Sequence, residues 1–269
     1  MRVTTLLLGM AIGISGWATG LPRVPYTEIT FLFTSSAALV GELRGVEARC
    51  ACGRVVSVEE WIDYTSRGPV QAFAFDPLEP KLYLVGPGSG EIRCVYYSLL
   101  GPLGEWTLYR HDRPVTDLAA RAEGGRSAIY FSSVDPGLGK GEVYRLLPGG
   151  DAQLEATISF DPAVDWWDGF FAFDPSGALY LSSGGRLPGR LYRVEDGRPL
   201  EVARIPARRI GGFLFLGPWV VLYSDLAGGV WKLDLRWGEP VPVYSSRGRF
   251  RISDVGLYPD WWEELSRGW

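Results

Sequence analysis

Three observations in the sequence predict an all-β fold. Glycine, proline and aromatic residues are abundant, with 35 Gly, 19 Pro and 13% Phe, Trp and Tyr among 269 residues. Long stretches with the 3.6-residue apolar period of a helix are nearly absent, and short apolar runs end at turns rich in Gly and Pro. A pattern of four such runs recurs at intervals of 43 to 51 residues. A repeat of this length, each copy a four-stranded meander, predicts a β-propeller.

The clearest copy lies within residues 168–206. Its first run, 170–173, ends at an Asp-Pro-Ser-Gly turn, whose residue types favour a turn. The second and third runs follow at 178–181 and 190–194, and Asp196-Gly197 turns the chain into the fourth. Three further copies lie within residues 70–112, 117–160 and 211–247.

The two ends of the chain predict a fifth blade. Residues 252–258 match a first run with no later runs behind it, whereas residues 27–66 hold later runs without a first one. We expect the C-terminal strand to pair into the N-terminal blade and close the ring, which removes its open edge. This gives five blades. Six are possible only if residues 21–64 hold more than one meander, since a blade of this kind takes about 40 residues.

The first 20 residues predict a secretory signal peptide. Arg2 precedes an apolar run from Val3 to Ala18, and the small residues Ala18-Thr19-Gly20 follow. The run is short for a membrane span, which takes about 20 apolar residues. We therefore expect a secreted or periplasmic protein with one propeller domain over residues 21–269. Any membrane contact would be through an uncleaved signal segment.

Charge and cysteine content narrow the partners. The formal net charge is −4 and the arginines form no basic stripe, which argues against nucleic acid. Cys50 and Cys52 form a Cys-x-Cys pair and Cys94 is left over. Buried free thiols and one bridge between Cys94 and a member of the pair are both open. We expect a monomer.

Two repeats resemble those of a known group of propellers. The segments FDPSGALYLSSGGRLPGRLYRVEDG (173–197) and SAIYFSSVDPGLGKGEVYRLLPGG (127–150) are similar to repeats of NHL-type and of gluconolactonase or strictosidine-synthase-like propellers. The resemblance covers residues 70–260 and implies the fold. It implies no single activity, since these families include binders, lactonases and lyases. They usually have six blades, and the count of five departs from that.

The resemblance also implies a cation site. Aligning the repeats on their turns places Val70, Asp117, Asp168, Gly211 and Asp254 at one position near the channel mouth. Gluconolactonase-like propellers hold a divalent cation in the channel through carboxylates and Asn amides, which assigns Asp117, Asp168 and Asp254 as its ligands here. Three convergent carboxylates cannot all ionise without a cation, and oxygen-only ligands suit calcium. The alternative is that each Asp accepts backbone N–H groups at a turn between blades.

A second candidate site is DWWDG at 165–169. Asp165, Trp166, Trp167 and Asp168 are predicted to bind ligand, because aromatic faces beside carboxylates suit sugar rings or cationic groups. At least one tryptophan of the pair is expected to pack between blades. A second segment with two tryptophans between acidic residues, DWWEE, lies at 260–264.

No catalytic set is complete in the sequence. His111 is the only histidine and is predicted to be a solvated link residue, so a Ser-His-Asp triad would depend on it alone. The sequence therefore favours a binding protein that presents an acidic, aromatic mouth to a small ligand, a glycan or a partner protein. The alternative is a calcium-dependent lactonase or hydrolase that uses the channel aspartates. A glycoside hydrolase with three central acids is the weaker enzyme alternative.

Overall fold

The computed structural model describes residues 26–35, 41–51, 54–98, 101–135, 137–160, 167–184, 187–205, 208–249, 251–259 and 261. These residues form strands β1 to β20. The predicted signal peptide lies outside them. Across these ranges, no helix has the length and apolar character that a membrane crossing requires.

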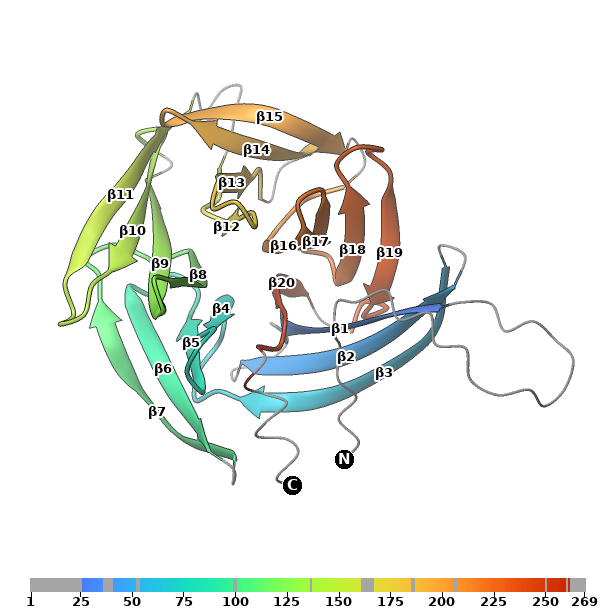
Figure 1. The fold of residues 1–269 in the computed structure, drawn as a ribbon, viewed down its shortest axis with the longest axis horizontal. Coiled ribbons are helices and arrows are strands. Elements are labelled where there is room, and N and C mark those ends of the chain that lie inside the picture. Colours follow the sequence, from blue (N-terminus) through green and yellow to red (C-terminus); the bar gives the residue numbers. More distant parts are fainter. Residues whose placement is uncertain are drawn as a thin grey trace, which may run out of the picture.

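The strands form five four-stranded antiparallel sheets around a central channel (Figure 1). From the inner to the outer strand, blade 1 contains β20 (Ile252–Gly256), β1 (Tyr26–Ser35), β2 (Glu42–Ala51) and β3 (Arg54–Thr65). Blade 2 contains β4 (Ala72–Phe75), β5 (Lys81–Val85), β6 (Glu91–Ser98) and β7 (Gly101–Arg110). Blade 3 contains β8 (Asp117–Glu123), β9 (Arg126–Asp135), β10 (Lys140–Leu146) and β11 (Ala152–Ser159). Blade 4 contains β12 (Phe171–Phe173), β13 (Leu179–Ser182), β14 (Gly189–Glu195) and β15 (Arg198–Ile205). Blade 5 contains β16 (Phe213–Gly217), β17 (Val220–Ser224), β18 (Gly229–Asp234) and β19 (Pro240–Ser245). The predicted five-bladed propeller is confirmed.

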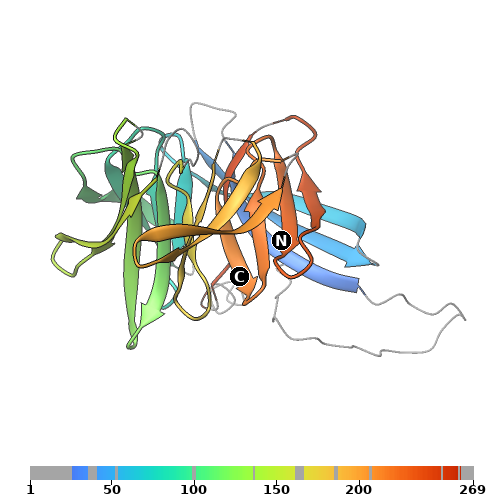
Figure 2. The ribbon, with the colours of Figure 1, turned by 90° about the horizontal axis from the view of Figure 1, so that it is seen from above.

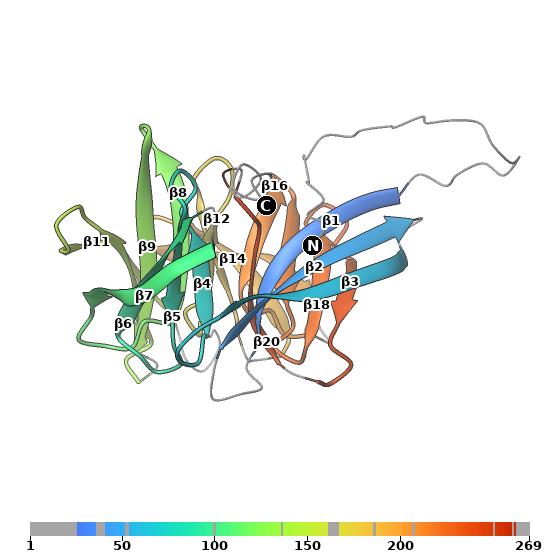
Figure 3. The same cartoon turned by 90° about the horizontal axis from the view of Figure 1, so that it is seen from below.

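The C-terminal strand closes the ring, as the sequence predicts. β20 pairs with β1 through Leu32↔Gly256, Phe33↔Val255 and Ser35↔Ile252. Strands β1, β2 and β3 are 10, 10 and 12 residues long, and they project beyond the ring on one side (Figure 3). The first blade is therefore assembled from both ends of the chain.

The ring has two faces, and the sheets stand between them when it is seen from the side (Figure 2). On the link face, each outer strand passes to the next inner strand, as at residues 66–71 and 111–116. On the turn face, each inner strand turns back into its second strand, as at 76–80 and 174–178. The sequence shapes these turns: Asp174 Oδ1 accepts the N–H groups of Ser176 (2.8 Å) and Ala178 (2.9 Å). Gly177 adopts φ 88°, which a glycine reaches without strain.

The core consists of five clusters of buried side chains, one at each seam between neighbouring blades. Three inner strands carry Phe-x-Phe, and these rings enter the seams. The ring of Phe173 lies 4.8 Å from Tyr130 of blade 3, and that of Phe215 lies 4.7 Å from Tyr180 of blade 4. Centroid distances of this size are favourable for aromatic pairs, so the rings hold neighbouring blades together.

Cys94 lies in the seam between blades 2 and 3. It is a buried free thiol, and its predicted bridge partners, Cys52 and the side chain of Cys50, lie outside the described part of the structure. Burial raises the pKa of the Cys94 thiol to about 12, which makes it unreactive at neutral pH.

A ring of hydrogen bonds connects each blade to the next at the link-face end of the channel. Hydroxyl groups on the second strands donate to a carbonyl at the start of the next inner strand or just before it: Ser132 to Gly169 (2.6 Å), Ser182 to Gly211 (2.9 Å) and Ser224 to Ser253 (3.0 Å). Between blades 1 and 2, Ser253 Oγ donates to the Gln71 carbonyl (2.6 Å) and lies 2.6 Å from Thr34 Oγ1. Blade 2 has Val85 at the hydroxyl position, and there Gln71 Nε2 donates to the Thr116 carbonyl instead (2.9 Å). All five seams are therefore connected.

Candidate functional site

Strand register decides which of the predicted aspartates share a level in the channel. Asp117 faces Ser132 on the neighbouring strand, and Asp254 occupies the same place in blade 1, where its N–H donates to Thr34 Oγ1. In blade 4 this place belongs to Phe170, whose carbonyl accepts from Ser182 N. Asp168 therefore lies two residues earlier, and the alignment that grouped it with Asp117 and Asp254 is wrong.

The same register corrects the two remaining members of that alignment. Ala72 faces Val85 in blade 2, so Val70 is two residues early. In blade 5, Gly212 accepts from Ser224 N, so Gly211 is one residue early. A Cβ atom on Gly212 would lie only 2.1 Å from Asp254 Oδ1. Blade 5 therefore needs glycine at this level to accommodate the carboxylate of blade 1.

Asp117 and Asp254 each connect two blades. Asp117 Oδ1 accepts the N–H of Leu118 (2.9 Å), and its Oδ2 accepts the N–H of Phe171 in blade 4 (2.8 Å). Asp254 makes the equivalent pair, with Val255 (2.8 Å) and with Phe73 of blade 2 (3.0 Å). The predicted alternative, in which these aspartates accept backbone N–H groups between blades, therefore describes both residues.

Both carboxyl groups are buried, with 2% and 4% of Asp117 and Asp254 exposed. Burial raises the pKa of Asp117 to about 7 in spite of its two N–H donors. Burial also raises the pKa of Asp254 well above its usual range, and the charge of Asp117 adds to the shift. The two groups titrate as a pair that keeps a proton near neutral pH.

The three predicted calcium ligands do not converge. Among the described residues, which include Asp117, Asp168 and Asp254, no group of three or more His, Cys, Asp or Glu side chains is placed to hold a metal ion. Two carboxylates come near each other, and all four of their oxygens already accept an N–H. A six- to eight-oxygen calcium shell would need ligands from elsewhere.

The DWWDG segment is only partly described: Asp165 and Trp166 lie outside the described residues. Trp167 is 2% exposed, and a Cβ on Gly141 would lie 2.2 Å from its ring. Its Nε1 donates to the Phe170 carbonyl (2.8 Å). Trp167 is thus the packing member of the pair and does not face a ligand. Asp168 is half-buried against Gly184, where a Cβ would lie 2.3 Å from Asp168 Oδ2.

His111 is not the solvated residue that the sequence predicts. Its side chain is 9% exposed, and its ring lies 4.8 Å from Tyr144 and 5.2 Å from Phe131. Nε2 lies 3.4 Å from Asp112 Oδ1 and makes no hydrogen bond with any described residue. Burial lowers the pKa of His111. The residues next to His111 in the sequence are polar, but in the fold the next blade surrounds its ring with aromatic side chains.

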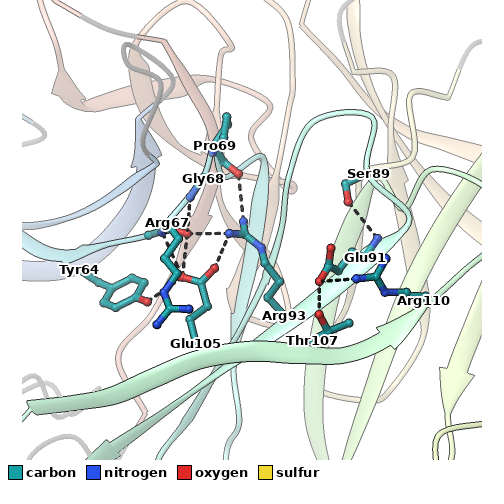
Figure 4. A network of polar contacts seen from close by, with 11 residues as sticks. Tyr64, Arg67, Gly68, Pro69, Ser89, Glu91, Arg93, Glu105, Thr107 and Arg110 are labelled. Carbon is teal, nitrogen blue, oxygen red and sulfur yellow. Dashed lines mark hydrogen bonds and ion pairs between the residues drawn. The ribbon is translucent and has the colours of Figure 1, made fainter.

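A polar cluster that the sequence analysis missed lies between blades 1 and 2 (Figure 4). Glu105 accepts from Tyr64 (2.8 Å) and pairs with Arg93, which also donates to the Pro69 carbonyl (3.0 Å). Burial alone would raise the pKa of Glu105, but these hydrogen bonds and the Arg93 charge lower it overall. A charge inside the apolar run of β6 was the only signal in the sequence. Because these groups bind one another, the cluster is structural.

The central channel contains a cavity of about 550 Å³ lined by all five inner strands. It extends from Asp117 and Asp254 to the turn face, where Pro77, Pro175 and Pro259 line it. Blades 2 and 4 carry Phe-Asp-Pro at the ends of their inner strands, whereas blade 3 carries Ala120-Arg121-Ala122. This departure from the repeat is the feature of the sequence that marks the cavity.

Arg121 stands at the rim of this cavity. Its guanidinium pairs with Glu123, and lies 4.8 Å over the Phe173 ring. Nη1 makes a long contact with the Gly177 carbonyl (3.4 Å). Glu123 pairs with Arg145 as well (2.8 Å), so the two arginines share one acid, and the cavity wall beside Arg121 consists of alanine side chains.

Comparisons with known proteins bear on the fold. No protein-family model matches the sequence, and no curated protein matches it. A chain in the crystal structure of a nidogen–laminin complex is similar, with a TM-score of 0.52 and 12% identity over 86% of both chains. TolB from Acinetobacter baumannii gives a TM-score of 0.48 and 13% identity over 81% of this chain and 53% of that one. The WD40 propeller domain of Doa1 gives 0.43 and 13% over 81% and 65%.

Of these three, the chain from the nidogen–laminin complex has a TM-score above 0.5, and as a β-propeller it agrees with the fold. Identities of 12–13% are too low to assign the activity of these proteins to this chain. The narrower resemblance to NHL and gluconolactonase propellers stays a prediction.

Proposed function

We propose that the chain is an exported binding protein whose central cavity receives a small ligand, a glycan or a segment of a partner protein. The observation that carries this proposal is the cavity of about 550 Å³ between the five inner strands. Its volume falls within the range of about 300–1,000 Å³ that is usual for ligand sites. A chain of similar fold occurs in a nidogen–laminin complex, which is consistent with a partner.

Binding is favoured over hydrolysis by the state of the candidate acids. A general acid or base must reach its substrate with a free lone pair or proton. Asp117 and Asp254 are buried and hold four backbone N–H groups between them. His111 is enclosed by aromatic rings in another seam.

The test is an NMR titration of the full chain with amino-acid amides, monosaccharides and simple aromatic alcohols, followed by the same titrations with Ala120→Phe. Ala120 lines the cavity, so the added ring occupies part of it. We expect at least one class of probe to bind and to lose affinity in the variant. If every probe that binds does so equally in both proteins, the proposal fails.

A calcium-dependent hydrolase is the second proposal, because two buried carboxylates line the cavity. Binding to the folded state alone raises the unfolding temperature in proportion to the logarithm of free metal. Thermal unfolding in calcium and in chelator, with Asp254→Asn as the variant, tests it. A midpoint that does not move with calcium concentration removes this proposal and leaves the first one intact.

A further inference from the structure

The class of ligand can be narrowed from the two kinds of surface that the cavity offers; this step rests on the proposed function. The first surface is the backbone of the inner strands. In an antiparallel pair, every second residue directs its N–H and C=O away from its partner strand. Phe171 and Phe73 are such residues, because their N–H groups point to acceptors outside their own sheets. In the described sheets, each inner strand pairs with a strand on one side only, and its other edge faces the channel.

By the same alternation, the residues two further along each strand direct their backbone toward the channel. These include Ala120, Phe173 and Phe215, all of which line the cavity. The residues that follow them turn inward to their own sheet again, as Asp174 N donates to the Ala178 carbonyl (3.0 Å). The wall of the cavity therefore presents peptide N–H and C=O groups in the spacing of a strand edge.

The second surface is the wall of blade 3. Ala119, Ala120 and Ala122 line the cavity there, whereas blades 2, 4 and 5 have phenylalanine at the position of Ala120. This wall is apolar and recessed relative to its neighbours. The polar side chains that border the cavity are engaged: Asp174 binds its own turn and Arg121 pairs with Glu123.

A ligand must therefore find its hydrogen bonds on the backbone and its apolar contact on the alanine wall. A sugar would need several polar side chains in convergent positions, which these contacts have already occupied. An extended peptide satisfies both surfaces, because it adds a strand to a sheet edge through main-chain hydrogen bonds and places alternate side chains into pockets.

We propose that the ligand of the central cavity is an extended segment of a partner protein. It pairs with an inner-strand edge from the turn face and places a large apolar side chain against Ala120 and Ala122, which lie on the same face of β8.

Three small probes separate the two surfaces in NMR titrations of the full chain. N-acetylphenylalanine amide carries backbone and ring, N-acetylalanine amide carries the backbone alone, and benzyl alcohol carries the ring alone. We expect the first to bind at least tenfold more tightly than either of the others. Equal affinity of benzyl alcohol and N-acetylphenylalanine amide would overturn the role of the backbone edge and with it the peptide.

Variants locate the binding. Ala120→Phe restores the residue found in three other blades and should weaken N-acetylphenylalanine amide at least tenfold, as should Ala122→Leu at an exposed position that also lines the cavity. The matched control is Ala227→Phe, which adds the same ring at an exposed position on the link face and should leave affinity unchanged. Binding that neither cavity variant weakens contradicts both this inference and the proposed function. A monosaccharide that binds in place of the amides, and is displaced by Ala120→Phe, overturns the peptide alone.

Discussion

The ring of hydrogen bonds between blades predicts a specific rescue. Four second strands carry a hydroxyl at one position, and blade 2 carries Val85 there, with Gln71 Nε2 serving the Thr116 carbonyl in its place. Gln71→Ala should leave that carbonyl without its donor. In the Gln71→Ala background, Val85→Ser should destabilise the fold less than it does in the parent protein, because the new hydroxyl can donate to the carbonyl that Gln71 no longer binds.

The magnitudes follow from the contacts. Loss of the Gln71 hydrogen bond should cost about 1–2 kcal/mol, since a partly buried acceptor is left unpaired. Val85 is fully buried, so Val85→Ser alone should cost about 3 kcal/mol, from lost methyl groups and an unsatisfied hydroxyl. In the double variant, hydroxyl and carbonyl satisfy each other. The two changes together should therefore cost about 1–2 kcal/mol less than their sum.

Urea unfolding of the four proteins measures this coupling energy. Val85→Ala, alone and combined with Gln71→Ala, is the matched control, because it removes methyl groups without adding a donor. Its coupling to Gln71→Ala should be near zero. A coupling energy for Val85→Ser that equals the value for Val85→Ala would refute the equivalence of Gln71 and the four hydroxyls.

Three further predictions concern buried charges. Arg93→Met should destabilise the fold by about 3–5 kcal/mol, because it leaves Glu105 charged and unpaired, and adding Glu105→Met should recover part of that loss in urea unfolding. His111 has a lowered pKa, so the folded state binds its proton less tightly than the unfolded chain; stability should fall as pH drops below about 6.5, and His111→Phe should reduce that slope in thermal unfolding. The pKa of Asp117 is raised to about 7, above the value of about 3.9 in an unfolded chain, so the stability that this shift contributes at acid pH should be lost as pH rises from about 4 to about 7. Asp117→Asn should lower the loss over that interval, and an unchanged slope would contradict the assigned ionisation.

The repeat pattern was sufficient to predict the blades and the closure of the ring, because each strand and turn follows from local residue types. Channel position was not predictable in the same way. The links before the inner strands differ in length, so an alignment on the turns does not fix which residues are equivalent. It placed Asp168 beside Asp117, although Asp168 lies two residues before the equivalent position. Environment was also hidden: His111 lies among polar residues in sequence, yet Phe131 and Tyr144 of the next blade enclose it. Contacts between blades join residues that are far apart in the sequence, so no local pattern predicts them.

The arrangement of hydrogen bonds along the channel indicates which end is available to a ligand. At the link-face end, the hydroxyl ring connects all five seams, and Asp117 and Asp254 add direct bonds from blade 3 to blade 4 and from blade 1 to blade 2. Their side chains and the adjacent carbonyls are thus committed to holding blades together, and a ligand that competed for them would loosen the ring. At the turn-face end, the hydrogen bonds between blades run between side chains and turns, as from Ser127 to Asp76 and from Arg121 to the Gly177 carbonyl. There blade 3 replaces Phe-Asp-Pro with small side chains. The sequence predicted a site at the aspartates, because carboxylates are common metal ligands and catalytic groups. The register shows that these acids connect neighbouring blades at the link-face end, and the binding proposed at the turn-face end leaves those bonds intact.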